Sequence, residues 1–382
     1  MPNSKTHRFV AAAGLVAVFL AAMPAPATAD PSSRRPNART AHGERFDLQA
    51  HRGGIALYTE NTLEGFANAL ELGVTTLELD VQITEDGHAV VTHDRNPSPV
   101  KCVDTEPAFA GDPEFPYVPG DTYIKDLTLA QVRTINCGYQ VLPQYPEQVL
   151  VEGARMPLLS EVFDLVRRYR ANHVTLNIEP KVEAGAPEQT APREEFVRVV
   201  VDEIDEARIG KQVTIQSFDW GTLMRMGEVA PNLPLVALTN GQQFLQAGRP
   251  GASPWLGGID IDDFEGSLQE KFVAAAASFG ADAVSPVHGD PQGGSVVDPG
   301  YVPFTTRDLV GAAHDRGMKV IPWTVNDRPT MEHLIELGVD GIITDRPDVL
   351  REVMAEYDFR LPRRYEAVGH RDRAPGRADY VK

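Results

Sequence analysis

The sequence of 382 residues predicts an α/β protein whose parallel strands close into a barrel of eight β/α units, (β/α)8. Short runs rich in β-branched residues alternate with amphipathic helical patterns through most of the chain. This alternation is typical of βαβ units and a parallel sheet. The strand candidates lie near residues 47, 77, 176, 214, 236, 283, 321 and 342. GGIDID near residue 260 is a ninth candidate, so the strand count stays open.

The N-terminal part of the chain is expected to lie outside this fold. Lys5 and Arg8 precede the apolar run FVAAAGLVAVFLAAM, and a small-residue triplet ends at Ala29. This pattern is that of a cleavable secretory signal peptide over residues 1–29, with cleavage after Ala29. Residues 30–44 are polar and aperiodic and are expected to form a flexible leader. No later run approaches about 20 apolar residues, so we expect a secreted protein without a stable membrane anchor.

Ionisable side chains stand near the carboxyl ends of the predicted barrel strands. His51 follows the strand FDLQA, and Glu78 and Asp80 lie two residues apart in TLELD. Glu179 and Lys181 have the same spacing in NIEPK. Because side chains alternate along a strand, each pair points to one side of the sheet. The carboxyl ends of the strands form the functional rim of such a barrel, so these groups are expected to converge there.

The rim also predicts a cation site. Glu78, Asp80 and Glu179 offer only oxygen ligands, which suit a hard divalent cation such as Ca²⁺ or Mg²⁺. Without a cation these carboxylates would repel one another and raise their own pKa values. His93 follows the run HAVVT, which the turn EDG sets up as one arm of a hairpin, so it is expected at the same rim.

One interval interrupts the alternation of strands and helices. Residues 95–157, between the second and third barrel strands, are rich in Pro, Asp and Tyr and are expected to form an inserted subdomain. The only two cysteines of the chain, Cys102 and Cys137, lie in it. In an oxidising compartment they are expected to pair as a structural disulfide, and a reactive cysteine is the alternative.

Composition limits the partners. The barrel domain is expected to span residues 45–358, and residues 359–382 form a polar basic tail. The formal net charge of −18 argues against nucleic acid and anionic membranes as partners. An anionic substrate would then need local cations. The oligomeric state is not specified by the sequence.

Several short motifs together resemble the glycerophosphodiester phosphodiesterase family in order and spacing. They are His51-Arg52-Gly53, Glu60-Asn61-Thr62, Glu78-Leu79-Asp80, Asp86-Gly87, His93-Asp94, Glu179-Pro180-Lys181, Gln216-Ser217-Phe218, Trp323-Thr324-Val325-Asn326 and the run from Gly341 to Pro347. The family usually has proline before Glu-Asn-Thr, and Thr59 stands there in this chain. We expect this departure to change the stiffness of the loop and not the chemistry.

The resemblance implies a (β/α)8 barrel with an inserted subdomain and a role for each rim residue. His51 and His93 would act as the acid/base pair. Glu78, Asp80 and Glu179 would hold one divalent cation.

The resemblance further implies that Arg52 and Lys181 contact the phosphate. Phe218 and Trp323 would line the pocket for the glycerol or the leaving alcohol, with ordinary barrel packing as the alternative. Glu60 would be a positioning residue near His51.

The expected function is metal-dependent hydrolysis of glycerophosphodiesters to an alcohol and glycerol 3-phosphate. Three points stay open: which histidine is the acid, whether water or a glycerol hydroxyl attacks, and which cation and head group are native. An alternative is a phospholipase- or teichoic-acid-type phosphodiesterase with the same site. A glycosidase using two carboxylates is disfavoured by the histidine pair and the cations. A non-catalytic binding protein is disfavoured because no site residue is missing.

Overall fold

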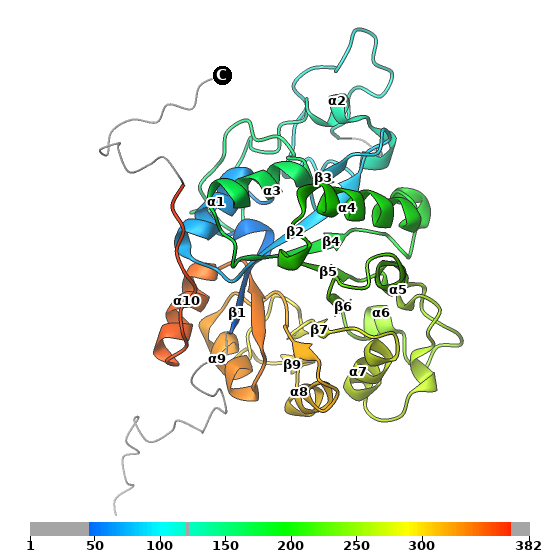
Figure 1. The fold of residues 1–382 in the computed structure, drawn as a ribbon, viewed down its shortest axis with the longest axis vertical. Coiled ribbons are helices and arrows are strands. Elements are labelled where there is room, and N and C mark those ends of the chain that lie inside the picture. Colours follow the sequence, from blue (N-terminus) through cyan, green and yellow to red (C-terminus); the bar gives the residue numbers. More distant parts are fainter. Residues whose placement is uncertain (1–45, 120–121, 368–382) are drawn as a thin grey trace, which may run out of the picture. The chain divides into compact units, whose positions relative to one another are not determined.

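The computed structural model describes residues 46–119 and 122–367. Within these residues, eight parallel strands follow one another around the sheet in the order of the sequence, with the last strand paired to the first (Figure 1). They are β1 (Asp47–Ala50), β2 (Thr76–Ile83), β4 (Thr175–Pro180), β5 (Val213–Ser217), β6 (Leu235–Thr239), β7 (Ala283–Pro286), β10 (Lys319–Val320) and β11 (Gly341–Thr344). The predicted barrel is therefore confirmed. The candidate near residue 260 is not a strand, because Ile261–Asp263 forms a 3-10 turn.

The ring closes between β10 and β11 through backbone hydrogen bonds beyond the short strand β10. The amide of Asp340 donates to the carbonyl of Val320 at 2.9 Å, and the amide of Ile343 donates to that of Pro322 at 3.0 Å. The amide of Val325 donates to the carbonyl of Ile343 at 3.1 Å. These bonds connect the two sides of the seam, as a closed barrel requires.

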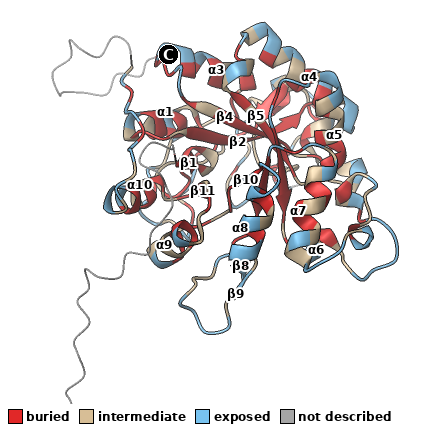
Figure 2. Ribbon diagram, turned by 60° about the horizontal axis from the view of Figure 1, so that its bottom comes forward, coloured by how far each residue is buried: buried red, intermediate tan, exposed pale blue. Residues whose placement is uncertain are grey.

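The helices cover the outside of the barrel. They are α1 (Leu63–Leu72), α3 (Leu159–Arg168), α4 (Arg193–Ala207), α5 (Trp220–Val229), α7 (Leu268–Ser278), α8 (Arg307–His314), α9 (Arg328–Leu337) and α10 (Pro347–Glu356). A shorter helix, α6 (Gln242–Leu245), lies between β6 and α7. Figure 2 shows buried strands inside a layer of helices whose outward faces are exposed. Thr62 caps α1 by accepting a hydrogen bond from the amide of Gly65, which ends the loop after β1.

Strand β2 shows how the alternation of side chains builds both core and site. Leu77, Leu79 and Val81 are buried in the hydrophobic core between the strands and the helices. Glu78 and Asp80 point the other way and line a cavity at the barrel rim. One strand therefore contributes apolar area to folding and carboxylates to the cavity.

The strand register aligns the rim residues. Ala50 at the end of β1 is paired with Thr344 at the end of β11, so the residues that follow, His51 and Asp345, emerge side by side. The two strands approach closely at Gly341, where a Cβ atom would lie 2.5 Å from the backbone oxygen of Asp47. Any larger residue at position 341 would push β11 away from β1, and with it the rim.

The interval after β2 forms a hairpin and then a long segment, residues 95–157, here called the inserted segment. Strand β3 (Ala89–Val91) pairs antiparallel with β2, as the turn EDG predicts. The inserted segment contains a short helix, α2 (Leu129–Val132), and a small hydrophobic cluster that includes Tyr117 and Ile124. A disulfide joins Cys102 and Cys137 with an S–S distance of 2.08 Å.

A second hairpin, β8 (Gly289–Asp290) with β9 (Val302–Pro303), follows β7. The predicted signal peptide and leader, and the part of the basic tail from residue 368 onward, lie outside the described residues. Across the described part of the chain, no helix combines the length and the apolar character needed to cross a membrane.

Candidate active site

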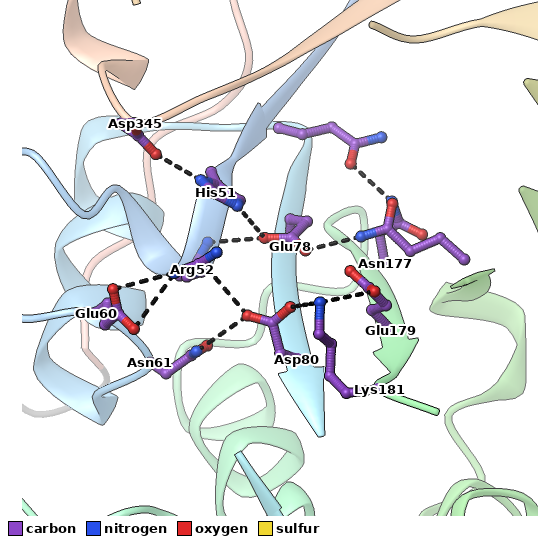
Figure 3. Close-up of polar contacts among 12 residues, drawn as sticks. His51, Arg52, Glu60, Asn61, Glu78, Asp80, Asn177, Glu179, Lys181 and Asp345 are labelled. Carbon is purple, nitrogen blue, oxygen red and sulfur yellow. Dashed lines mark hydrogen bonds and ion pairs between the residues drawn. The ribbon is translucent and has the colours of Figure 1, made fainter. Parts of the chain in front are cut away.

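Three buried carboxylates form the centre of the cavity at the carboxyl ends of the strands. Asp80 on β2 is the registered partner of Glu179 on β4, so the two side chains lie next to each other. Glu78 stands two residues before Asp80 on the same side of β2. One oxygen from each of the three lies within 4.8 Å of the others, and the residues are 1%, 1% and 5% exposed (Figure 3).

Hydrogen bonds from neighbouring elements hold two of these carboxylates in place. Glu78 Oε2 accepts from the backbone amide of Arg52 at 2.8 Å, and its Oε1 accepts from Gln216 Nε2 at 2.7 Å. Asp80 Oδ2 accepts from Asn61 Nδ2 at 3.2 Å and lies 3.2 Å from Arg52 Nε. The carboxylates therefore have fixed orientations before any ligand enters.

The pKa values of the three carboxyls are shifted in different directions. Burial and the neighbouring Asp80 raise the pKa of Glu78 to about 8. Burial raises the pKa of Glu179 to about 7, although Lys181 opposes the shift from 2.9 Å. Burial would also raise the pKa of Asp80, but the charge of Arg52 and other nearby cations outweigh it and hold the pKa well below its usual range. Two of the three carboxyls thus lack enough positive charge to ionise fully near neutral pH.

This donor set fits a hard divalent cation. Glu78, Asp80 and Glu179 offer oxygen atoms alone, close together and buried, and the raised pKa values of two of them indicate missing positive charge. A cation there would bind the ionised forms and relieve the repulsion among them. The donor set is compatible with Ca²⁺ or Mg²⁺ and does not choose between them.

His51 is held from behind by a carboxylate network. Its Nδ1 lies 2.5 Å from Asp345 Oδ1. Because a carboxylate oxygen accepts, Nδ1 is the donor, and Nε2 is left facing the cluster, 4.0 Å from Glu78 Oε2. The second oxygen of Asp345 accepts from Tyr145 Oη at 2.5 Å and from Asn326 Nδ2 at 2.6 Å.

His93 has a similar arrangement on the other side of the site. Its Nδ1 lies 2.7 Å from Asp94 Oδ1, so Nδ1 again donates, and Nε2 has no hydrogen-bond partner among the described residues. The other oxygen of Asp94 lies 2.9 Å from Lys101 Nζ, and the same nitrogen donates to Glu60 Oε1 at 2.9 Å. Glu60 also accepts from Arg52 Nη1 at 3.2 Å.

The pKa values of the two imidazoles are shifted in opposite directions. Burial and the charge of Arg52 lower the pKa of His51, but the carboxylates Asp345 and Glu78 outweigh them, so its pKa lies above the ordinary value. Burial, together with the charges of Arg52 and Lys181, lowers the pKa of His93 to about 4. The pKa values of the two imidazoles are thus shifted apart, as is common for pairs of groups in acid/base catalysis.

Aromatic rings form a second side of the cavity, whose volume is about 610 Å³. Lys181 Nζ lies 5.6 Å from the ring centre of Phe218, which packs edge-on against Trp323 at 5.2 Å and against Phe244 at 5.1 Å. Phe244 stacks on Trp255 at 4.2 Å. All four rings are partly exposed and line the cavity, so they offer an apolar surface to a ligand held at the carboxylates.

The structure brings nine of the predicted site residues around this one cavity: His51, Arg52, Glu78, Asp80, His93, Glu179, Lys181, Phe218 and Trp323. Their chemical roles stay predictions. Arg52 and Lys181 are paired with the carboxylates, at the positions from which they would meet an anion.

Glu60, expected as a positioning residue near His51, contacts the next residue of the chain, Arg52. Its carboxylate contacts Arg52 and Lys101, and its pKa is lowered because these cations outweigh its burial. Any positioning role of Glu60 therefore acts on Arg52. Cys102 and Cys137 lie away from the large cavity and line a small neighbouring one.

Several polar residues that contact the site received no role from the sequence, including Asn61 and Gln216, which donate to the carboxylate cluster. Asp345 follows the end of β11, and Asp94 follows His93, so the strand-end argument applied to both. Tyr145 and Lys101 lie in the inserted segment, where no periodic pattern indicates which side chains turn toward the barrel.

Comparison with known proteins gives the same family as the motifs. The chain matches the sequence model of the glycerophosphoryl diester phosphodiesterase family over residues 51–349. It is 28% identical over 301 residues to a glycerophosphodiester phosphodiesterase from Caldanaerobacter subterraneus subsp. tengcongensis, which covers 79% of this chain and 94% of that relative.

Two solved structures extend the comparison. A Silicibacter pomeroyi protein provisionally named glycerophosphoryl diester phosphodiesterase is 29% identical, covers 84% of this chain and 96% of its own, and superposes with a TM-score of 0.65. An Oleispira antarctica phosphodiesterase in complex with the product sn-glycerol-3-phosphate is 17% identical, covers 81% and 96% of the two chains, and has a TM-score of 0.55. The second likeness shows the shared fold.

Proposed function

The chain belongs to the glycerophosphoryl diester phosphodiesterase family and is an enzyme of that class, and from this premise we propose that it hydrolyses glycerophosphodiesters to an alcohol and glycerol 3-phosphate with one divalent cation. One observation carries the proposal. The buried cluster of Glu78, Asp80 and Glu179 lies in the same cavity as two histidines whose Nδ1 atoms are bound by carboxylates. The related enzyme bound to sn-glycerol-3-phosphate supports the choice of product.

In this proposal the histidines move protons through Nε2. Because Asp345 and Asp94 hold the Nδ1 protons of His51 and His93, Nε2 is the atom of each ring that can accept or donate toward the cavity. One Nε2 takes the proton from the attacking oxygen as the new P–O bond forms. The other gives a proton to the alcohol oxygen as the old P–O bond breaks. The attacking oxygen belongs to water or to a neighbouring glycerol hydroxyl. In the second case the first product is a cyclic phosphate, which water then opens to glycerol 3-phosphate.

In this proposal the positive charges of Arg52 and Lys181 attract an anionic substrate to a protein whose net charge is negative. The side chains of Arg52 and Lys181 are only 13% and 15% exposed and line the cavity. Their pKa values are raised because nearby carboxylates outweigh the effect of burial. Arg52 and Lys181 would bind the anionic phosphoryl oxygens and stabilise the charge that builds there during attack. A divalent cation held by Glu78, Asp80 and Glu179 would supply further positive charge at the same oxygens.

The test is release of glycerol 3-phosphate from glycerophosphocholine by the chain from Asp30 onward. It is run with Ca²⁺, with Mg²⁺ and with EDTA, beside His51→Ala and Glu78→Ala. Cation-dependent release that both substitutions abolish supports the proposal. A folded chain that releases no glycerol 3-phosphate under any of these conditions contradicts it.

A larger substrate is the second candidate, and the aromatic side of the cavity favours it. Phe244 and Trp255 extend the surface formed by Phe218 and Trp323, and a cavity of about 610 Å³ leaves room for a bulky alcohol. A lysophospholipid or a teichoic acid fragment would fit this description. Higher kcat/KM for lysophosphatidylcholine than for glycerophosphocholine would favour this reading, and the reverse order would reject it.

We also propose that the chain is exported after cleavage behind Ala29. The signal-peptide pattern and the disulfide between Cys102 and Cys137 support this, because structural disulfides persist in oxidising compartments. N-terminal sequencing of the protein from the culture medium should begin at Asp30. Retention of the full-length chain inside the cell would contradict export.

A further inference from the structure

In both histidine–carboxylate pairs, a side chain of the inserted segment contacts the carboxylate. Tyr145 donates to the oxygen of Asp345 that does not hold His51, at 2.5 Å. Lys101 contacts the oxygen of Asp94 that does not hold His93, at 2.9 Å. His51 and Asp345 follow the barrel strands β1 and β11, whereas His93 and Asp94 follow the hairpin strand β3, yet both carboxylates receive a contact from the same interval of the chain.

Hydrogen bonds hold the inserted segment against the barrel close to Tyr145. The side chain of Gln148 donates to the carbonyls of Ile55 and Tyr58, at 2.5 Å and 3.1 Å, and the amide of Val149 donates to Leu57 at 2.8 Å. These residues follow His51 in the loop after β1. Tyr145 therefore approaches Asp345 from a backbone that is tied to the loop carrying the histidine.

Hydrogen bonds and the disulfide also hold the inserted segment close to Lys101. The amides of Lys101 and Cys102 both donate to the carbonyl of Ser98, at 2.9 Å and 2.7 Å, and Cys102 is bonded to Cys137. Lys101 is thereby held next to a covalent cross-link. Its ammonium bridges Asp94 and Glu60, and the latter contacts Arg52 in the cavity.

We propose that the inserted segment orients both catalytic histidines, with Tyr145 and Lys101 as positioning residues that fix the carboxylates behind the rings. The inference rests on the proposed roles of His51 and His93. A carboxylate with fewer contacts can rotate, and the imidazole rotates with it. At Asp345 the side chain of Asn326 also donates to the second oxygen, at 2.6 Å, so Tyr145 shares this restraint. With both oxygens held, the Nδ1–H form and the direction of Nε2 are fixed.

The predicted effect of losing either contact is a lower kcat with little change in KM, because ring orientation matters most in the transition state. Tyr145→Phe keeps the ring and removes only the hydroxyl. Because Asn326 still holds the same oxygen of Asp345, kcat should fall roughly 5-fold to 10-fold. Lys101→Met should act in the same direction. Lys101→Arg, which keeps a cation near Asp94, should recover part of the loss.

Matched controls lie in the same segment. Tyr117 also donates a buried hydrogen bond to an aspartate, Asp112, at 2.6 Å, but this pair touches neither histidine. Tyr117→Phe should therefore lower stability about as much as Tyr145→Phe and leave kcat within about two-fold. Lys125, paired with Asp126 on the surface, gives the matching control Lys125→Met.

A readout that needs no turnover separates this inference from the proposed function. The ring ¹⁵N resonances of His51 and His93 report which nitrogen carries the proton. Tyr145→Phe should change the resonances of His51 alone, and Lys101→Met those of His93 alone. A wild-type chain without activity would reject the proposed function, and these resonances would still decide the inference. Unchanged His51 resonances and kcat in Tyr145→Phe would overturn the role of Tyr145, and the same result for His93 in Lys101→Met would overturn that of Lys101.

Discussion

Removal of the divalent cation should make the folded chain lose stability as the pH rises from 7 to 8.5. Glu78 has its pKa raised to about 8 by burial and by Asp80, and Glu179 has its pKa raised to about 7 by burial. In the unfolded chain both titrate near pH 4.5, their ordinary value. Between the two values the folded state holds protons that the unfolded state has lost, so stability falls as the pH rises through the folded pKa.

The size of the effect follows from the same values. Each group lowers the free energy of unfolding by about 1.4 kcal/mol per pH unit until its folded pKa is reached. From pH 7 to 8.5 this amounts to about 1 kcal/mol for Glu78 and less than half of that for Glu179, or roughly 1–2 kcal/mol together. His93, with a pKa of about 4, is neutral in both states over most of this range, whereas the raised pKa of His51 adds to the fall in the same direction.

Denaturant unfolding followed by tryptophan fluorescence measures the effect in EDTA and in excess Ca²⁺ or Mg²⁺. The bound cation selects the ionised carboxylates, so the fall should disappear in its presence. Glu78→Gln should remove most of the fall in EDTA. Glu194 is an exposed carboxylate that pairs with Arg225 and has a lowered pKa. Glu194→Gln should leave the fall in the free energy of unfolding unchanged. A free energy of unfolding that stays level or rises from pH 7 to 8.5 in EDTA would refute this reasoning.

Three further predictions address the disulfide, the aromatic side and the histidines. Cys102→Ser with Cys137→Ser opens a loop of 35 residues, and the free energy of unfolding should fall by about 4 kcal/mol; an unchanged denaturation midpoint would contradict this. Trp323→Ala should raise KM for glycerophosphocholine about ten-fold and leave KM for glycerophosphoglycerol within about three-fold, and equal changes would contradict an alcohol-binding role. A nitrophenyl leaving group needs no general acid, so either His51→Gln or His93→Gln should regain activity on a nitrophenyl phosphodiester of glycerol; if both or neither did, the division into acid and base would be wrong.

The barrel was predictable because each strand carries its own local signal. TLELD and NIEPK each combine buried apolar residues on one side with carboxylates on the other, and the strand-end rule then places Glu78, Asp80 and Glu179 together. The register of β2 with β4, which makes Asp80 and Glu179 neighbours, agrees with that expectation. The candidate near residue 260 failed because its short apolar pattern also suits a 3-10 turn.

The network behind His51 was not predictable from local patterns. Asp345 lies 294 residues from His51, and the two meet only because β11 pairs with β1 when the barrel closes. Tyr145 lies 200 residues from Asp345 in a segment without periodicity. The partner of Glu60 was missed for a related reason, since Lys101 reaches it from the inserted segment.

The central claim is that one divalent cation, held by Glu78, Asp80 and Glu179, supports hydrolysis in this cavity. The most direct measurement titrates the cation-free chain with Ca²⁺ or Mg²⁺ and follows both binding and glycerol 3-phosphate release on the same sample. We expect one ion per chain, release that rises in proportion to the bound fraction, and loss of both in Asp80→Asn. Full activity of the cation-free chain, or activity in Asp80→Asn without cation binding, would contradict the claim.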